Sequence, residues 1–388
     1  MGRGPFHGGG PLNFFKMFKF KIVKSSRKNL SRRGEITTSR GKVQTPVFMP
    51  CATRGSVKGI SSEELKSLGY EMILANTYHL YLRPGDQEIK EFGGLQKFIN
   101  WSGPILTDSG GYQVFSLGKN FRNYDEEREI VSLVNVQNDG VWFKSHLDGS
   151  KHFFSPEKVI EIQKNLGSDI TMVLDECTEY PAKKSRVKVS MEQTHRWAKR
   201  SIEYWQKQGN NHQALFGIVQ GGIYKDLREE SVRFISSLGF DGIAIGGVSV
   251  GEGKRNMYKV MKWVGPLLPK DKPHYLMGVG EPADIIEAAK WGFDMFDCVL
   301  PTRLGRHGTI WITSDWQKFN KIDLGKSKYQ KDKKVLMANC HCPACKAGYS
   351  RAFISHLIKE KEMLGMRLAT LHNLWLINNL MKKIRKSI

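Results

Sequence analysis

Residues 215–245 read LFGIVQGGIYKDLREESVRFISSLGFDGIAI, and this stretch decides the fold. Residues 215–219 and 242–245 are short apolar runs of the length typical of buried strands. Between them, residues 226–238 carry apolar side chains at helical spacing. A buried strand, a helix and a second buried strand form a unit whose two strands lie parallel.

The same alternation recurs along most of the chain. The apolar runs that we expect to be strands are residues 47–49, 72–75, 105–107, 170–174, 215–219, 242–245, 275–277 and 295–296. Amphipathic stretches lie between them, so the sequence predicts an α/β fold, a (β/α)₈ TIM barrel. The alternative is an open doubly wound sheet, but the glycine-rich phosphate turn that such a sheet carries after its first strand is missing.

Two segments depart from this pattern. Residues 131–154 alternate apolar and polar side chains, with turn signals at 138–140 and 148–149, which predicts an inserted β-hairpin. We expect a barrel over residues 17–325 and a small zinc-binding lobe with C-terminal helices over residues 326–388. The glycine-rich residues 1–16 are expected to be a disordered extension, with Met17 as an alternative start.

The lobe contains half of the six cysteines of the chain. Cys340, Cys342 and Cys345 are spaced to converge from a tight loop, and His372 on a following helix can complete a tetrahedral Zn²⁺ site. Four protein ligands leave no open position, so this zinc is expected to be structural. His341 is a competing fourth ligand, although its place between two ligands would strain the ring geometry.

Composition points to the kind of partner. The 60 Lys and Arg against 38 Asp and Glu give a formal charge of +22, which favours nucleic acid. A general lysine bias of the source proteome is the alternative explanation. No apolar run reaches the ~18 residues of a membrane span, and the N-terminus lacks a secretory signal, so we expect a cytoplasmic protein without membrane contact.

In a (β/α)₈ barrel the carboxyl ends of the strands line the active site. The residues that close the apolar runs are Asn76, Thr77, Asp108, Asp175, Gln220, Gly246, Gly247, Gly278 and Asp297. Each aspartate could merely cap the next helix. Two carboxylates facing across a sugar, however, can break an N- or O-glycosidic bond. Arg303 and Arg306 suit a phosphate-bearing substrate, unless they pair with carboxylates of the rim.

Several motifs together resemble one family. They are DSGGYQ at 108–113, DEC at 175–177, QGG at 220–222, HYLMGVG at 274–280, DMFDCVLPTR at 294–303, and the three cysteines with His372. Over roughly residues 18–388 they resemble tRNA-guanine transglycosylase, also called queuine tRNA-ribosyltransferase, of the bacterial type. The resemblance implies a homodimeric barrel with one zinc per subunit that replaces the wobble guanine of tRNAs with a G-U-N anticodon.

The resemblance also implies residue roles. Asp297 is the expected nucleophile at ribose C1′, and Asp108 is the expected general acid/base. The expected base-binding residues are Asp108, Ser109, Gly110, Gly111, Tyr112, Asp175, Gln220 and Gly247. The expected RNA-binding residues are Gly278, Val279, Gly280, Glu281, Pro282, Ala283, Asp284, Thr302, Arg303, Leu304, Gly305 and Arg306.

The chain also departs from the family pattern. Glu281 replaces a common lysine, His307 a common asparagine and Val248 a common leucine, which puts details of RNA and base contacts in doubt. Asp175-Glu176-Cys177 resembles bacterial members, which accept preQ1 (7-aminomethyl-7-deazaguanine), so preQ1 is the expected incoming base.

Two competing functions remain at this level. A non-catalytic tRNA-binding subunit of the same fold would not need all three rim aspartates. A barrel glycosidase acting on free sugars would leave the basic charge and the zinc lobe unexplained.

Overall fold

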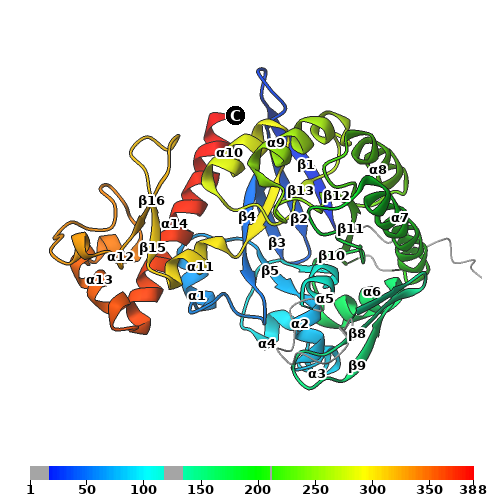
Figure 1. The fold of residues 1–388 in the computed structure, drawn as a ribbon, viewed down its shortest axis with the longest axis horizontal. Helices are drawn as coiled ribbons and strands as arrows, with labels where there is room; N and C mark the ends of the chain where they lie inside the picture. Colours follow the sequence, from blue (N-terminus) through cyan, green and yellow to red (C-terminus); the bar gives the residue numbers. More distant parts are fainter. Residues whose placement is uncertain (1–16, 118–133, 210–211) are drawn as a thin grey trace, which may run out of the picture.

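The computed structural model describes residues 17–117, 134–209 and 212–388. Within them, parallel strands close into a barrel in the order β10-β11-β12-β13-β14-β4-β5-β6 (Figure 1). These strands are β4 (Val47–Ala52), β5 (Ile73–Asn76), β6 (Ile105–Asp108), β10 (Ile170–Met172), β11 (Ala214–Val219), β12 (Gly242–Ile245), β13 (His274–Leu276) and β14 (Met295–Cys298). All eight predicted strands are confirmed, and pairing of β14 with β4 excludes the open sheet.

Helices cover the outside of the barrel. They are α1 (Ser62–Ser67), α2 (Thr77–Leu82), α3 (Asp86–Glu91), α4 (Leu95–Phe98), α5 (Gly111–Leu117), α6 (Pro156–Leu166), α7 (Lys184–Lys207), α8 (Lys225–Ser237), α9 (Gly253–Val264), the short 3₁₀ helix η1 (Gly265–Leu267), α10 (Pro282–Lys290) and α11 (Leu300–Arg306). Local sequence sets their limits. In α6, Ser155 caps the first turn, Pro156 is the first helical residue and Gly167 ends the helix at φ 71°.

A separate antiparallel sheet lies at the amino end of the barrel. It consists of β1 (Lys19–Ser25), β2 (Arg32–Thr38) and β3 (Gly41–Thr45). Arg32 on β2 donates to both carboxylate oxygens of buried Asp294, which precedes β14. Its guanidinium also donates to the carbonyls of Lys270 and Lys272. These hydrogen bonds stabilise the amino end of the barrel. We therefore expect a ligand site at the carboxyl end.

The insertion is an antiparallel sheet of β7 (Val134–Gln137), β8 (Gly140–Lys144) and β9 (Lys151–Phe154). Both predicted turns are present, and the second adds one strand to the expected hairpin. Gly140 has φ 158°, and a Cβ there would lie 2.2 Å from the carbonyl oxygen of Phe154, so this turn requires glycine. The expected residues 131–133 lie outside the described residues.

After α11 the chain forms a two-stranded sheet of β15 (Thr309–Ile312) and β16 (Asn320–Asp323), and the C-terminal lobe follows with η2 (Ser327–Tyr329), α12 (Pro343–Lys346) and α13 (Arg351–Lys359). The long α14 (Met363–Ser387), red in Figure 1, lies between this lobe and the barrel. It is bonded to both, because Asn373 donates to the carbonyls of Pro301 and Thr309 and Asn378 donates to the carbonyl of Leu68.

We propose residue 325 as the boundary between barrel and lobe, since β16 ends just before it. The expected extension, residues 1–16, lies outside the described residues. In the described part of the chain, no helix combines the length and apolar character needed to cross a membrane.

Candidate active site

The strand ends bring the sequence-predicted residues to one rim. Asp297 lies near the end of β14 and Asp108 at the end of β6, whereas Gln220 directly follows β11 and Asp175 is the third residue after β10. Because the strands close in a circle, these side chains face a common mouth. In the described part of the chain, α7 and α11, the helices that follow Asp175 and Asp297, are capped by Lys183 and Val299, so the helix-cap alternative is wrong for these two aspartates. Asp108 accepts the N–H of Thr77, the first residue of α2, although Asn76 is the capping residue of that helix.

The two carboxylate oxygens of Asp297 have different partners. Oδ1 accepts hydrogen bonds from the hydroxyl of Tyr275 at 2.6 Å and from the backbone N–H of Gly278 at 2.8 Å. Oδ2 accepts only the thiol of Cys51, at 3.5 Å, among the described residues. Burial raises the pKa of Asp297, opposed by these donors. One oxygen is thus fixed, and the other is available for chemistry.

Asp108 is held from the neighbouring strand β5. Asn76 donates to Oδ2 at 2.5 Å, and the backbone N–H of Thr77 donates to Oδ1 at 3.1 Å. The same Asn76 amide accepts the N–H of His79 as the cap of α2, so its orientation is determined. Burial raises the pKa of Asp108 to about 7, with a further contribution from the charge of Asp297. A carboxyl group of that pKa can both give and take a proton near neutrality.

A third carboxylate is buried among polar side chains. Asp175 accepts the amide of Gln220 at 2.6 Å and the hydroxyl of Ser109 at 3.4 Å, and burial raises its pKa to about 6. Two glycines let Gln220 lie close to the backbone here. A Cβ at Gly246 would lie 2.7 Å from Nε2 of Gln220, and one at Gly247, which has φ 59°, would lie 2.3 Å from its Oε1. An ionised carboxylate at this place can accept hydrogen bonds from a ligand edge that carries donors.

A buried arginine holds the backbone next to Gln220. Arg228 on α8 is fully buried, and its guanidinium donates to the carbonyls of Val219, Gly222, Gly246 and Gly247. It thereby joins the loops after β11 and β12. Burial lowers the pKa of Arg228 to about 10, so it keeps its charge at neutral pH.

Besides Arg228, the carboxylate of Glu252 also holds the loop after β12. Glu252 accepts the backbone N–H groups of Ser249 at 2.6 Å and Val250 at 2.9 Å. Ser249 has φ 60°, a conformation that the two bonds help to hold. Because these N–H groups are directed to Glu252, the carboxylate fixes the backbone that follows Gly247.

The remaining expected base contacts lie on one loop. Ser109 and Gly110 connect β6 to α5, and Gly111 and Tyr112 begin that helix. A Cβ at Gly111 would lie 2.7 Å from the carbonyl oxygen of Asp175, so glycine permits this close approach. The ring of Tyr112 is 52% exposed and remains accessible to a flat ligand.

The two segments expected to bind RNA differ in accessibility. In the loop after β13 and at the start of α10, Val279, Pro282 and Asp284 are buried. In α11, Thr302 and Gly305 are buried and Leu304 is half-buried, whereas Arg303 is exposed and Arg306 is half-buried. Within the described residues, neither arginine forms an ion pair with a rim carboxylate, so that alternative is wrong. Both arginines stand beside the strand end that carries Asp297.

Glu281, which replaces a lysine common in the family pattern, has an ion-pair partner. Glu281 forms an ion pair with Lys321 on β16 and accepts the indole N–H of Trp311 at 3.3 Å. The negative charge is therefore compensated by a lysine of the sheet that precedes the lobe. The other departures are an exposed His307 directly after α11 and a buried Val248.

The predicted metal ligands converge. The sulfur atoms of Cys340, Cys342 and Cys345 lie 3.6, 3.4 and 3.8 Å from Nδ1 of His372. Ligand atoms on a tetrahedral Zn²⁺ are separated by about 3.6 Å, given the usual Zn–S and Zn–N bond lengths. Nε2 of His372 is 2.8 Å from the carbonyl oxygen of Trp311, which suits donation of its N–H and leaves Nδ1 as the ligand atom. These four buried residues form a Cys₃His cluster suited to a metal ion.

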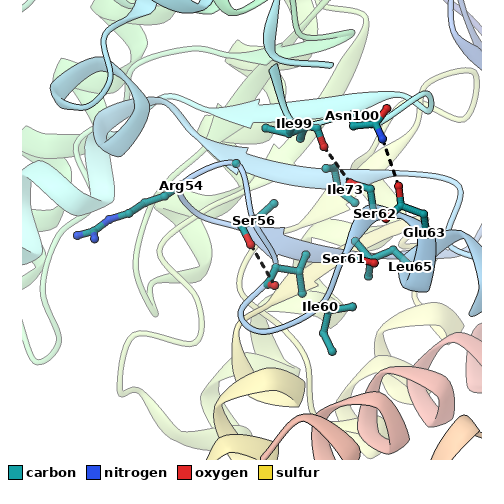
Figure 2. A pocket seen from close by; sticks show the side chains of 13 residues that line it. Arg54, Ser56, Ile60, Ser61, Ser62, Glu63, Leu65, Ile73, Ile99 and Asn100 are labelled. Atoms are coloured by element: carbon teal, nitrogen blue, oxygen red, sulfur yellow. Dashed lines mark hydrogen bonds between the residues drawn. The ribbon is translucent and has the colours of Figure 1, made fainter. Parts of the chain in front are cut away.

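A cavity of about 400 Å³ lies to one side of the rim (Figure 2). Its polar groups bond to each other or to the backbone: Ser62 donates to the carbonyl of Ile99, and Asn100 donates to Glu63. Arg54 points away from the other lining side chains. The cavity therefore presents little that would select a ligand.

Sequence reasoning missed several residues that support the site. Tyr275 and Cys51 lie within strands and read as core residues, and Arg228 lies on the buried face of α8. A charged residue at a buried helix position was a usable signal for Arg228. Nothing distinguished Cys51 from an ordinary core thiol.

Known proteins resemble the chain over nearly its whole length. A model of the family described as queuine tRNA-ribosyltransferase matches residues 27–388. A queuine tRNA-ribosyltransferase of Desulforamulus reducens is 48% identical over 370 residues, covering 95% of this chain and 94% of the relative. Relatives of the same name from Ruminiclostridium cellulolyticum and Fusobacterium nucleatum are each 50% identical, covering 95% and 92% of this chain and 93% and 91% of their own lengths.

Proposed function

The chain belongs to the queuine tRNA-ribosyltransferase family of pentosyltransferases, and we propose that it exchanges the wobble guanine of tRNAs with a G-U-N anticodon for preQ1. The exchange is a step of queuosine biosynthesis and passes through a covalent aspartyl-ribose intermediate. The observation that carries this proposal is the rim itself, where Asp297 and Asp108 lie at strand ends of the same barrel mouth as the hydrogen-bonded pair of Asp175 and Gln220.

Asp297 attacks C1′ of the ribose while the bond from C1′ to guanine breaks. Tyr275 and Gly278 hold its other oxygen, which supports attack from a fixed direction. Asp108, with a pKa of about 7, gives a proton to the departing base and takes one from the incoming base. The ester keeps the opened site on the RNA until the second base arrives.

Asp175 recognises the base edge. An ionised carboxylate accepts from the ring N–H and the exocyclic amino group of a guanine-like base, and Gln220 orients it. The backbone of Gly247, which lies close to Gln220, bonds to the edge of the base, and Tyr112 stacks on the exposed face of the base. Such stacking requires the wobble base to leave the anticodon stack.

We expect Asp175→Asn to remove the selectivity of the enzyme for a base that carries the exocyclic amino group of guanine. Asparagine cannot accept both donors of the base edge, so kcat/KM for guanine should fall by about 10²-fold. Hypoxanthine, which lacks the amino group, is the matched probe. The wild type should prefer guanine, and the variant should lose that preference while its tRNA affinity is unchanged. A variant that still prefers guanine as strongly as the wild type would remove Asp175 from base recognition.

We expect a pH optimum set by the two catalytic carboxylates. Exchange requires ionised Asp297 and protonated Asp108, so activity should rise from acid pH and decline above about pH 7. Asn76→Asp keeps an oxygen to cap α2 but replaces a donor to Asp108 by a second carboxylate. The pKa of Asp108 should rise, and the alkaline limb should move up by about one pH unit or more.

Rates of guanine exchange between pH 5 and 9 measure this shift. The tRNA affinity of the variant, measured at one pH, controls for folding. An unchanged alkaline limb in Asn76→Asp would show that another group sets it.

We propose that the metal of the Cys₃His cluster is one structural Zn²⁺ per chain. Cys340, Cys342, Cys345 and His372 would hold it, and three thiolates with one imidazole favour zinc among the available divalent ions. The bound metal would cross-link the cysteine loop of the lobe to α14. The exchange reaction would take place at the barrel rim.

We further propose that the anticodon loop contacts the segments 278–284 and 302–306. Exposed Arg303 and partly exposed Arg306 provide charge for phosphates next to Asp297, and the excess of basic residues favours tRNA in general. The enzyme is proposed to act as a homodimer in the cytoplasm, where its tRNA substrates serve translation.

A further inference from the structure

The thiol of Cys51 occupies a particular place beside the reacting carboxylate. Cys51 lies on β4, the strand that pairs with β14, and its side chain is 8% exposed. Its sulfur is 3.5 Å from Oδ2 of Asp297. Oδ1 is already bonded to the hydroxyl of Tyr275 and the N–H of Gly278. The oxygen that remains for attack is therefore the one that faces Cys51.

We infer that Cys51 is a positioning residue for the exchange, its S–H group orienting Oδ2 of Asp297 toward ribose C1′. This inference rests on the proposed function. In the step it assists, the bond from Oδ2 to C1′ forms and the bond from C1′ to guanine breaks. The electron pair leaves with the base, which receives its proton from Asp108. The thiol keeps its own proton throughout.

A thiol can perform this task. Its S–H group donates to the carboxylate oxygen, and a hydroxyl at the same place can donate to that oxygen as well. Burial and the neighbouring charge of Asp297 raise the pKa of Cys51 well above its usual value, so the donor proton is present at neutral pH.

Three donors lower the pKa of Asp297 against the effect of burial: the backbone N–H of Gly278, the hydroxyl of Tyr275 on β13 and the thiol of Cys51 on β4. The other titratable groups near it are Asp108, across the mouth on β6, and Cys298, its neighbour on β14. Removing the Cys51 donor takes stabilisation from the ionised form, so the pKa of Asp297 rises. Because exchange needs the ionised carboxylate, the acid limb of activity then moves to higher pH.

The test compares Cys51→Ala, which lacks the donor, with Cys51→Ser, which retains one. Cys298→Ala removes the neighbouring thiol and is the matched control. Guanine exchange into tRNA is measured against pH, with separate kcat and KM. The carboxyl ¹³C signal of Asp297, assigned by its loss in Asp297→Asn, is titrated in each protein.

For Cys51→Ala we expect kcat to fall by about fivefold with the KM for tRNA unchanged, since a hydrogen bond to a charged group is lost. Both the acid limb and the titration of Asp297 should move to higher pH. Cys51→Ser and Cys298→Ala should behave like the wild type.

Equal loss in Cys51→Ala and Cys51→Ser, or a wild-type titration of Asp297 in Cys51→Ala, would overturn the inference. A folded wild type that exchanges no guanine would instead refute the proposed function. In that case the titration of Asp297 in Cys51→Ala still shows whether the thiol lowers the pKa of this carboxylate.

Discussion

Asp297→Asn should reduce guanine exchange by about 10⁴-fold or more, the effect expected when a covalent nucleophile is lost. The amide oxygen can still accept from Tyr275 and Gly278, so the side chain should keep its place. The amide nitrogen would replace Oδ2, and it cannot form an ester with ribose. Binding of tRNA should change by less than about twofold, because the reacting groups contribute little to the phosphate contacts that dominate affinity.

Asp294→Asn is the matched control, since Asp294 precedes the same strand but serves the opposite end of the barrel. It is fully buried and bonded to Arg32, so its loss should lower thermal stability. Exchange per folded molecule should nevertheless persist. The two variants together separate chemistry from folding. Retention of more than a tenth of wild-type exchange in Asp297→Asn would remove Asp297 from the nucleophile role.

The second large effect is expected at the metal cluster. Cys342→Ser should release the metal and lower the melting temperature by about 10 °C or more, because metal binding and folding of such lobes are coupled. Cys342 is fully buried, and its sulfur also accepts the backbone N–H of Cys345. His372 lies on α14, so the loss should also loosen the contact between lobe and barrel.

His341→Ala is the control that decides between the two histidines considered as the fourth ligand. His341 is exposed, and its ring lies near that of Trp375 instead of joining the cluster. Metal content measured by atomic emission should stay near one ion per chain in His341→Ala and fall to almost none in Cys342→Ser. Metal-free Cys342→Ser protein with full thermal stability would refute a structural metal.

The barrel could be predicted because its strands are buried on both faces. Parallel strands covered by helices appear as uniform apolar runs, and polar residues at their ends then stand out. Asp108, Asp175 and Asp297 were identified in this way. The third strand of the insertion was harder, because β9 contains lysine, histidine and aromatic residues without clear alternation.

The partners of the site residues could not be predicted in the same way. Tyr275 and Cys51 lie inside apolar strands, where a hydroxyl or thiol is indistinguishable from packing until the closing of the barrel brings Asp297 beside them. The compensation of Glu281 by Lys321 joins residues that are 40 positions apart, which no local pattern reveals. Sequence alone thus pointed to the residues that we propose as reacting groups, and their positioning became visible only in the fold.

The central claim is base exchange at the wobble position, and the most direct test is incorporation of labelled guanine into tRNA with a G-U-N anticodon. We predict that the metal-loaded protein incorporates guanine, that changing the wobble guanine to adenine prevents it, and that preQ1 displaces the label irreversibly. A folded, metal-loaded protein that binds this tRNA but incorporates no label would contradict the account and would indicate a non-catalytic tRNA-binding subunit.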